Sequence, residues 1–472
     1  MPAVLHFPSN EVTVVLSLFS CRSALLVVIV LTAVSATRAQ LPAATILKEL
    51  TSSAQCNRCS GTLLRGRAYA NPAAKWGIIS DLPESFKGYG VLYSTRDVLP
   101  ANGGAPELLR QRKANGFEVI DGSFDVFIFH LMAKEPSQVS RIVVHAKNLG
   151  EEPVTLDAMQ VIRTEGLIGT VHEFESGIAM RVLANNWDRP VGKVTLQPGQ
   201  GRIVAYGKRF GNIANGPDAS KNINCFGYVR CLVDGAKPAR LQVDVVAIPP
   251  TEIKDIPAET AKWLDKGATS TDEVPMDSEP QGCDLRRAVG VYPNPVWRND
   301  ATVIDVSKLP ESGIRFPMAL PKIQTDGCED ARQSVDLVLR PGYTREDTIG
   351  NYMMEYDVRL TFINPDENAH AFDVTFRGEL ADIGLAYQLN EQAPAEPETP
   401  ATAVYNGIPV LSQWAGPKQS AKEKPLLPKP IRLEPGTSRT IAIRFLIVGN
   451  SSLPFMLIAK KADTESGAQT PY

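Results

Sequence analysis

The chain has 472 residues, with 49 lysines and arginines against 52 aspartates and glutamates, so its formal net charge is −3. Nucleic-acid-binding domains are normally basic or carry a stripe of Lys and Arg, and this sequence shows neither feature. With 43% apolar and 21% charged residues the chain can form a substantial hydrophobic core, which excludes disorder along its whole length. The 35 glycines and 36 prolines favour many turns over long helices.

An apolar run near the N-terminus predicts that the protein is exported. Residues 24–36 read ALLVVIVLTAVSA and precede small residues, as in a signal peptide cleaved after Ala36 or Ala39. A retained membrane anchor is the alternative, but a run of about 13 residues is shorter than the roughly 20 that span a bilayer. A lipid-modified Cys21 is a second alternative, although the strongest apolar run follows this cysteine. We therefore expect a signal peptide at 1–39 and no membrane span in the mature chain.

The cysteine count also favours export. Removing the signal peptide leaves six of the seven cysteines, and an even number in an exported chain predicts a disulfide framework. Spacing alone does not select one connectivity. Proximity in the sequence suggests pairing Cys56 with Cys59, Cys225 with Cys231, and Cys283 with Cys328.

Cys56 and Cys59 form a Cys-x-x-Cys motif, for which a structural disulfide competes with three other interpretations. No second Cys-x-x-Cys follows to complete a zinc ribbon, and no histidine follows Cys59 as haem attachment requires. No βαβ pattern surrounds the motif, as a redox fold would show. The structural disulfide is the simplest interpretation.

Most of the chain reads as short β-strands. After a leader at 40–69, with a helical turn or two at 46–53, runs of β-branched and aromatic residues alternate with turn signals such as Gln197-Pro198-Gly199. Many short strands with regular turns are typical of an antiparallel sandwich or barrel, and we place a first β-sandwich domain at 70–250. Its expected strands lie at 89–95, 124–132, 141–147, 154–161, 193–196, 202–206 and 241–248.

The composition changes after this first domain. Residues 251–285 are rich in Pro, Thr, Ser, Asp and Glu, which is typical of a linker. One helix is expected within it at 258–266, where Pro257 sets the start and Gly267 the end.

An internal repeat relates the first domain to the C-terminal part of the chain. Residues 194–205 match 431–442 without a gap and share the pattern Leu-x-Pro-Gly-x-x-Arg, for which we expect a type II turn at Pro-Gly. Upstream of each copy an alternating strand ends at an asparagine, Asn148 or Asn364, turns, and resumes as a second strand. This pattern is typical of a hairpin.

The repeat predicts a second β-sandwich domain at 286–463, with a proline-rich insertion at 391–429 and a tail at 464–472. The predicted fold class is therefore all-β, with two tandem antiparallel β-sandwiches, immunoglobulin-like or jelly-roll-like, joined by a short helical linker. Length alone suggests about three domains, and the repeat reduces this number to two larger ones.

Signals for catalysis are weak. The chain has no Gly-x-Ser-x-Gly nucleophile elbow and no phosphate-binding loop, so we expect no cofactor. His130 and His145 lie in neighbouring strand patterns, where a two-histidine metal site across a hairpin competes with two structural histidines. A calcium loop at 366–368 is the weakest candidate, because the Asp-x-Asp-x-Asp pattern is missing. We therefore assign no catalytic, cofactor-binding or metal-binding residue.

Two tryptophans are candidates for ligand binding. Trp187 and Trp414 lie in loop-like sequence, one in each predicted domain, and an exposed aromatic ring can stack on the face of a sugar. The alternative is that each ring anchors a loop over the end of its sandwich.

Several segments resemble one known family. Residues 350–365, GNYMMEYDVRLTFINP, resemble the signature "GNYG-x-x-Y-x-V-x-L-x-x-x-N", and further likeness lies at 90–95, 124–127 and 142–159. The signature is that of secreted cyanobacterial proteins catalogued as domain of unknown function 3370, and the likeness extends over roughly residues 85–460. The resemblance implies export and the fold, but no activity, cofactor or catalytic residue.

Together these features predict an exported cell-envelope or periplasmic protein with a non-enzymatic binding or structural role. Its expected partner is a glycan or an envelope protein, and not a nucleic acid. A secreted carbohydrate-active hydrolase on the same scaffold is the alternative. A third hypothesis is an adhesion or assembly subunit that recruits its partner through an edge strand.

Overall fold

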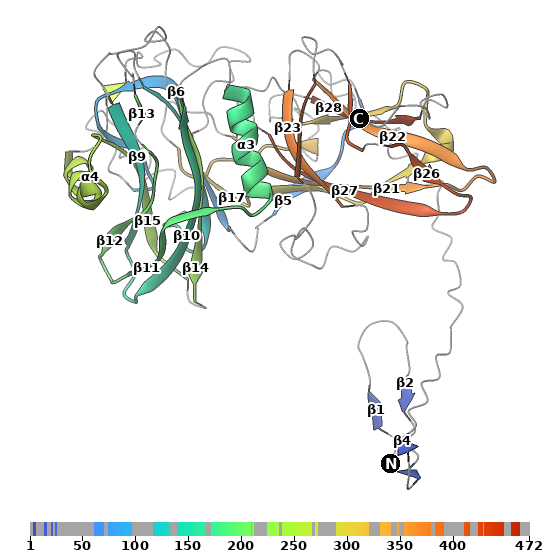
Figure 1. Cartoon of the computed structure of the whole chain (residues 1–472), viewed down its shortest axis with the longest axis horizontal. Coiled ribbons are helices and arrows are strands. Elements are labelled where there is room, and N and C mark those ends of the chain that lie inside the picture. The colour runs from blue at the N-terminus through green and yellow to red at the C-terminus, as the bar shows by residue number, and fades with distance from the viewer. Residues whose placement is uncertain are drawn as a thin grey trace. The chain divides into compact units, whose positions relative to one another are not determined.

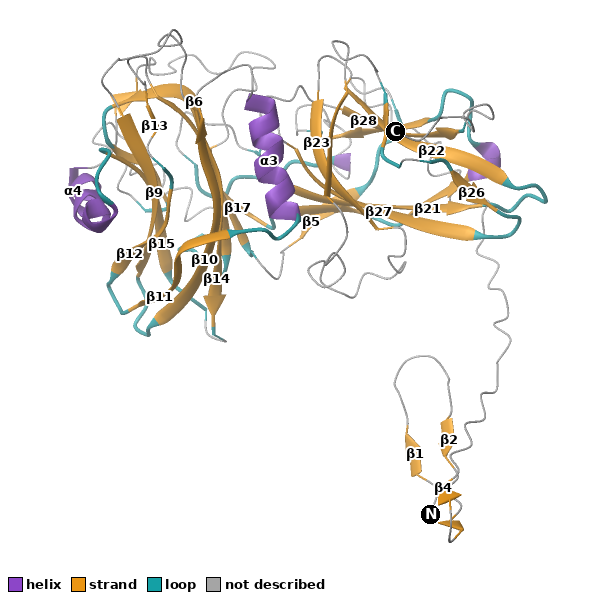
Figure 2. Cartoon of the chain, in the orientation of Figure 1, coloured by secondary structure: helices purple, strands orange, loops and turns teal. Residues whose placement is uncertain are grey.

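The computed structural model describes most of the chain between residues 61 and 462 (Figures 1 and 2). The described stretches are 3–5, 14–16, 20–21, 24–25, 61–69, 74–96, 117–132, 139–165, 171–208, 210–211, 224–235, 238–266, 270–271, 289–320, 331–340, 347–348, 354–378, 383–390, 410–415, 423–427, 429–447 and 455–462. They belong to two compact units, Met1–Ile46 and Leu47–Tyr472.

Short strands are described in the first unit. They are β1 (Ala3–Leu5), which pairs with β2 (Val14–Leu16), and β3 (Ser20–Cys21), which pairs with β4 (Ala24–Leu25). Most of the predicted signal peptide and the helical turn at 46–53 lie outside the described residues. No helix in the described part of the chain is long and apolar enough to cross a membrane.

The second unit consists mainly of β-strands (Figure 2). In chain order these strands are β5 (Gly66–Tyr69), β6 (Trp76–Lys87), β7 (Gly90–Ser94), β8 (Phe124–Met132), β9 (Val139–Asn148), β10 (Val154–Glu165), β11 (Asp188–Leu196), β12 (Gly201–Tyr206), β13 (Phe210–Gly211), β14 (Asn224–Asp234), β15 (Leu241–Ile248), β16 (Ser270–Thr271), β17 (Val289–Pro293), β18 (Val296–Asn299), β19 (Thr302–Asp305), β20 (Ile314–Met318), β21 (Glu355–Ile363), β22 (His370–Gly378), β23 (Ile383–Asn390), β24 (Val410–Ala415), β25 (Lys424–Pro425), β26 (Ile431–Leu433), β27 (Ser438–Ile447) and β28 (Phe455–Lys461). The described helices are α3 (Val171–Leu183), α4 (Ile256–Lys266) and the short 3-10 helices η1 (Ile253–Asp255) and η2 (Val306–Lys308).

These strands form four large sheets, which we call A to D. Sheet A has the order β11-β10-β14-β8-β6-β16, with β17 also paired to β6, and sheet B has the order β12-β9-β15-β7, with β13 paired to β9. Sheet C has the order β24-β23-β27-β21-β18-β5, with β19 paired to β21. Sheet D has the order β20-β28-β22-β25, with β26 paired to β22. The fold is all-β, as predicted.

Each pair of sheets encloses a hydrophobic core. Phe124, Val126 and Ile128 alternate along β8 and point from sheet A into a core that they share with strands of sheet B. A second core lies between sheets C and D, and Phe362 of sheet C stacks on Phe372 of sheet D with ring centroids 4.2 Å apart. We call sheets A and B the first β-sandwich, and sheets C and D the second.

Some strand pairs are parallel, whereas the sequence predicted antiparallel sheets. β6 pairs in parallel with β8, and β18 and β19 both pair in parallel with β21. After β6 the chain enters sheet B as β7 and then returns to sheet A as β8, so two reversals restore the original direction. The antiparallel prediction is correct for the other described pairs of the four sheets.

The predicted repeat is present, but its strand pairs are not hairpins. β9 belongs to sheet B and β10 to sheet A, so the turn after Asn148 carries the chain from one sheet to the other. The turn after Asn364 does the same between β21 of sheet C and β22 of sheet D. The two predicted hairpins are therefore wrong, because an alternating pattern predicts strands without telling which sheet the next strand joins.

A buried asparagine holds each of these corners together. The side-chain amide of Asn148 donates to the carbonyl oxygens of Glu152 at 2.7 Å and Leu196 at 3.1 Å. Asn364 makes the two equivalent bonds at 2.8 and 3.0 Å. The bonds to Leu196 and Leu433 are buried, and each satisfies a backbone carbonyl that is costly to bury without a donor.

A Pro-Gly turn lies beside each corner. Gly199 has φ 73° and Gly436 has φ 68°, the left-handed conformation that the third residue of a type II turn requires. The amide of each glycine donates to the backbone carbonyl oxygen of the corner asparagine, at 2.9 Å to Asn148 and 2.7 Å to Asn364. The predicted turn is confirmed, and it connects strands of different sheets.

The helix predicted in the linker is confirmed as α4. The helix ends at Lys266, just before the predicted stop. It packs on the outer face of sheet B, where Ile256, Trp263 and Leu264 contact Val143 and Val246.

Helix α3 was not predicted. Its sequence, VHEFESGIAMRVL, contains a glycine and several β-branched residues, which lower helix propensity. Its buried residues recur at helical spacing and pack on the outer face of sheet A. They are Ile178, Ala179, Val182 and Leu183.

Two strands pair across the predicted domain boundaries. β5 comes from the predicted leader, yet it pairs with β18 in sheet C. β17 comes from the predicted second domain, yet it pairs with β6 in sheet A. The amide of Asn294 donates to the carbonyl oxygen of Lys75 at 3.1 Å, so the segments that carry these two strand pairs lie side by side there.

Candidate functional site

A row of polar side chains crosses the outer face of sheet B. Val243 of β15 and Ala146 of β9 point into the core of the first sandwich. Because side chains alternate along a strand, Asp244 and His145 point to the opposite face. Asp244 pairs in register with His145 on one side and with Ser94 of β7 on the other. Three neighbouring strands thus bring a serine, an aspartate and a histidine together.

Asp244 is the centre of this row, and its carboxylate is fully buried. Ser94 donates through Oγ to Oδ1 at 2.5 Å, and Nδ1 of His145 lies 3.0 Å from Oδ2. Gln242 donates through Nε2 to both carboxylate oxygens, at 2.9 and 3.0 Å. These donors replace the water that a buried carboxylate loses, so Asp244 is a satisfied polar hub.

The order of the three groups differs from that of a catalytic triad. In a Ser-His-Asp triad the histidine lies between the other two residues and accepts the serine proton. Here Asp244 lies in the middle, and the hydroxyl of Ser94 donates directly to the carboxylate. This arrangement does not activate Ser94 as a nucleophile, because the imidazole that would take its proton bonds to the far side of Asp244.

His145 is fixed by its neighbours. The bond between Nδ1 and Asp244 favours the tautomer with its proton on Nδ1, which leaves the acceptor lone pair on Nε2. The ring lies close over Gly201 of β12, where a Cβ atom would clash with Nε2 and Cε1. The side chain is 12% exposed. The row therefore holds His145 between Asp244 and the backbone of Gly201, and its order is not that of a hydrolytic triad.

The metal site considered for His130 and His145 is wrong. The two residues lie in different sheets, His130 on β8 of sheet A and His145 on β9 of sheet B. His130 is fully buried, and its Nε2 lies 2.9 Å from Oγ of Ser80. Burial lowers the pKa of His130 to about 3, which keeps the ring neutral at physiological pH. Within the described ranges no group of three or more His, Cys, Asp or Glu side chains is placed to hold a metal ion.

The disulfide predicted between Cys225 and Cys231 is also wrong, because both cysteines are free. They lie on one strand, β14, and a strand rises about 3.3 Å per residue, which separates their Cα atoms by about 20 Å. A disulfide requires Cα atoms within about 7 Å of each other. Both thiols are buried in the core of the first sandwich, and burial raises the pKa of each. Cys56, Cys59, Cys283 and Cys328 lie outside the described residues, so their predicted pairing stays a prediction.

Trp187 packs against sheet A. Its ring lies over the guanidinium of Arg230, whose carbon is 5.4 Å from the ring centroid, and the ring centroid of Tyr228 is 6.0 Å away. Its Nε1 donates to Oδ1 of Asn185 at 2.6 Å. These contacts support the interpretation of Trp187 as a loop anchor. Sugar stacking on this half-buried ring stays a prediction.

Two other candidates lie in the second sandwich. Trp414 was expected in a loop, but it belongs to β24, where it pairs with Gly384 of β23. In the calcium candidate at 366–368, Oδ2 of Asp366 is 2.8 Å from Nε2 of His370, and Oδ1 accepts from the amide of Glu367 at 2.6 Å. The hydrogen bond with His370 lowers the pKa of Asp366. This carboxylate closes a turn.

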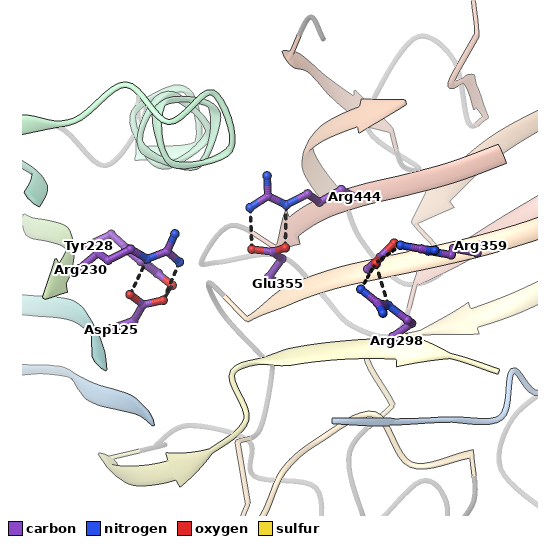
Figure 3. Close-up of polar contacts among 8 residues, drawn as sticks. Asp125, Tyr228, Arg230, Arg298, Glu355, Arg359 and Arg444 are labelled. Atoms are coloured by element: carbon purple, nitrogen blue, oxygen red, sulfur yellow. Dashed lines mark hydrogen bonds and ion pairs between the residues drawn. The ribbon is translucent and has the colours of Figure 1, made fainter. Parts of the chain in front are cut away.

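A set of buried ion pairs that was not predicted from the sequence lies on the outer faces of sheets A and C (Figure 3). Arg230 donates to both oxygens of Asp125 at 2.8 Å, and the hydroxyl of Tyr228 donates to the same carboxylate at 2.6 Å. Arg444 donates to both oxygens of Glu355 at 2.6 and 2.8 Å. Each guanidinium holds its carboxylate through two parallel bonds, the strongest geometry for such a pair.

A third carboxylate, Asp357, lies between two arginines. Nη2 of Arg298 is 2.6 Å from Oδ2 of Asp357, and Nη2 of Arg359 is 3.1 Å from the same oxygen (Figure 3). A single charge in an otherwise apolar strand, such as Asp125 in FDVFIFHLM, is the sequence signal that could have indicated these pairs. Apart from Arg359, which is two residues from Asp357, the partner of each carboxylate is distant in the sequence and cannot be read from it.

No family model matches the chain, and no curated protein matches it at a significant level. The resemblance to secreted cyanobacterial proteins therefore stays a prediction from the sequence.

Proposed function

We propose that the protein is an exported component of the cell envelope or periplasm with a non-enzymatic binding or structural role. Export is supported by the apolar run at 24–36 and by the family resemblance. The support from the cysteines is weaker than the count suggested, because Cys225 and Cys231 are free.

The non-enzymatic role is supported mainly by the hydrogen bonds that the buried carboxylates accept. Asp125, Asp244, Glu355 and Asp357 each accept hydrogen bonds from side chains on neighbouring strands. Such satisfied networks make a sheet rigid, whereas a catalytic acid must reach its substrate. A rigid sandwich holds its loops and edges in place for a ligand, and many β-sandwich domains bind their ligands through these parts.

The ligand class that we propose is a glycan or another envelope protein. A glycan would stack on the candidate tryptophans, Trp187 and Trp414, because apolar ring faces gain from shedding water against sugar faces. An envelope protein would add a strand to a sheet edge. The alternative function, a secreted carbohydrate-active hydrolase, predicts turnover of the same glycans.

A binding experiment separates these possibilities. The full-length mature protein is applied to a glycan array beside Trp187→Ala and Trp414→Ala, with Trp263→Ala on α4 as the matched control. We expect one of the first two variants to bind at least about tenfold more weakly, in keeping with the contribution of one buried aromatic ring. The control variant should bind as the unaltered protein does. A binding profile unchanged in both candidate variants overturns the glycan proposal.

Turnover and export are measured separately. Bound glycans incubated with the protein should release no new reducing ends, and their release would establish the hydrolase instead. N-terminal sequencing of the chain recovered from the periplasm or medium should begin just after Ala36 or Ala39. An intact N-terminus in the cytoplasmic fraction would contradict export.

A further inference from the structure

A two-stranded ribbon runs through both β-sandwiches. In sheet C, β5 pairs with β18, and Tyr69 lies opposite Val296. A few residues further on, in sheet A, β6 pairs with β17, and Trp76 lies opposite Pro293. The two pairings follow one another on the same two chain segments. The sandwiches are thus joined by two paired segments, unlike domains on a single linker, which move relative to one another by default.

Close packing on two glycines fixes the ribbon in each sandwich. The ring of Tyr292 lies directly over Gly77, where any Cβ atom would clash with it. At the other end, a Cβ atom at Gly66 would clash with the ring of Trp297 and the backbone of Arg298. A side chain at Gly66 would meet the backbone of Arg298 and push the two segments apart, whereas a side chain at Gly77 would displace the buried ring of Tyr292.

Helix α3 adds a shared hydrophobic cluster. One side of the helix contacts β10 and β14 of sheet A, and the helix also contacts β23, β24 and β27 of sheet C (Figure 1). The cluster contains Phe129 and Tyr228 from the first sandwich and Leu446 from the second, together with Ala179 and Val182 of α3. Burial of these side chains from water depends on both sandwiches at once.

The buried charges also act across this region (Figure 3). Burial by itself lowers the pKa of Arg230, but Asp125 on its own sheet and Glu355 on sheet C both raise it, and the net shift is upward. Glu355 is held in turn by Arg444. Carboxylates of both sandwiches therefore stabilise one guanidinium.

We propose that the two β-sandwiches form one rigid body that unfolds in a single cooperative step, with the ribbon and α3 as the elements they share. This coupling is independent of which ligand the protein binds. It makes the loops of one sandwich keep a fixed position relative to those of the other, so a ligand contacting both meets a preorganised surface.

Calorimetry of the full-length mature protein tests the proposal. We expect one transition whose van't Hoff enthalpy equals the calorimetric enthalpy, and two resolved transitions would overturn it. Ala179→Arg inserts a charged side chain into the shared cluster, and Ala184→Arg places the same side chain at an exposed position just after α3. We expect the first variant to split the transition in two and the second to leave it single. A single unshifted transition in Ala179→Arg contradicts the proposal.

If Ala179→Arg does not fold, hydrogen exchange of the unaltered protein tests whether the two sandwiches open together. In the unaltered protein, the slowest amides of β14 in sheet A and of β21 in sheet C should exchange with the same opening free energy. They should also respond equally to small additions of denaturant. Clearly different opening free energies for the two strands would show that the sandwiches open separately, and would overturn the proposal.

Discussion

The side-chain amide of Asn148 donates a hydrogen bond to the carbonyl oxygen of Leu196 at 3.1 Å, across two strands that enter the same corner of the first sandwich. Asn364 makes the equivalent bond in the second sandwich, and in both corners the neighbouring Pro-Gly turn bonds back to the asparagine. The recurring motif of the sequence thus encodes a point where two chain segments pass together from one sheet to the other.

Replacing these asparagines should destabilise the protein. Asn148→Ala leaves two carbonyl oxygens at the corner without their donor, and we expect the free energy of unfolding to fall by about 1 to 3 kcal/mol. Asn364→Ala should have an effect of similar size. Urea unfolding measures both, with Asn368→Ala as the control because its side chain is exposed. Equal midpoints for all three variants and the unaltered protein would contradict the structural role.

The free cysteines of β14, Cys225 and Cys231, should be unreactive in the folded protein. Their thiols are buried and their pKa values are raised, so little thiolate is present or accessible. We expect Cys225 and Cys231 to react with a thiol reagent at least about 100-fold more slowly than in urea, since reaction requires opening of the core. Peptide mass spectrometry after timed labelling measures both rates. Rapid labelling of either cysteine under native conditions would show that this strand is not in the core.

His130 should make the protein sensitive to acid. The unfolded state binds a proton at pH values below about 6.5, whereas the folded state keeps the ring neutral down to a pKa of about 3. Protonation therefore favours unfolding, and stability should fall as the pH is lowered from about 6.5 to 3, by at most about 5 kcal/mol. His130→Gln should flatten this part of the stability curve, measured by urea unfolding at several pH values. An unchanged slope in the variant would place the acid sensitivity elsewhere.

Removing only one partner of the pair formed by Asp125 and Arg230 should lower the stability of the protein strongly. Arg230→Met leaves a buried carboxylate without its cation, and we expect a loss of about 3 to 5 kcal/mol. The double variant, with Asp125→Leu added, should recover a large part of this loss. Denaturant unfolding of the two single variants and the double variant gives the coupling energy. Additive losses would mean that the two side chains do not act as a pair.

Much of the fold could be predicted from local patterns. The alternation in FDVFIFHLM places Phe124, Val126 and Ile128 on one face, and those residues are in the core. Helix α4 was found because a proline and a glycine mark its ends. The turns at Gly199 and Gly436 could also be predicted, because a Pro-Gly pair strongly restricts the backbone.

The predictions that were wrong concern features that depend on contacts between distant segments. The strand that follows Asn148 joins the opposite sheet, and nothing in the local sequence distinguishes such a corner from a hairpin. Cys225 and Cys231 are close in sequence, but an extended strand between them keeps them apart. The candidate polar row was missed because Ser94 and Asp244 are 150 residues apart and meet only through the register of sheet B.

The ribbon also has a consequence for biosynthesis. Ala68 of β5 pairs with Trp297 of β18, so at about 5–20 residues per second β5 leaves the ribosome roughly 10 to 50 s before its partner is made. During that interval sheet C cannot be completed, and the nascent chain carries an unpaired strand that can join the wrong neighbour. Translation must therefore proceed well beyond β15, as far as β17, before the first sandwich has all of its strands.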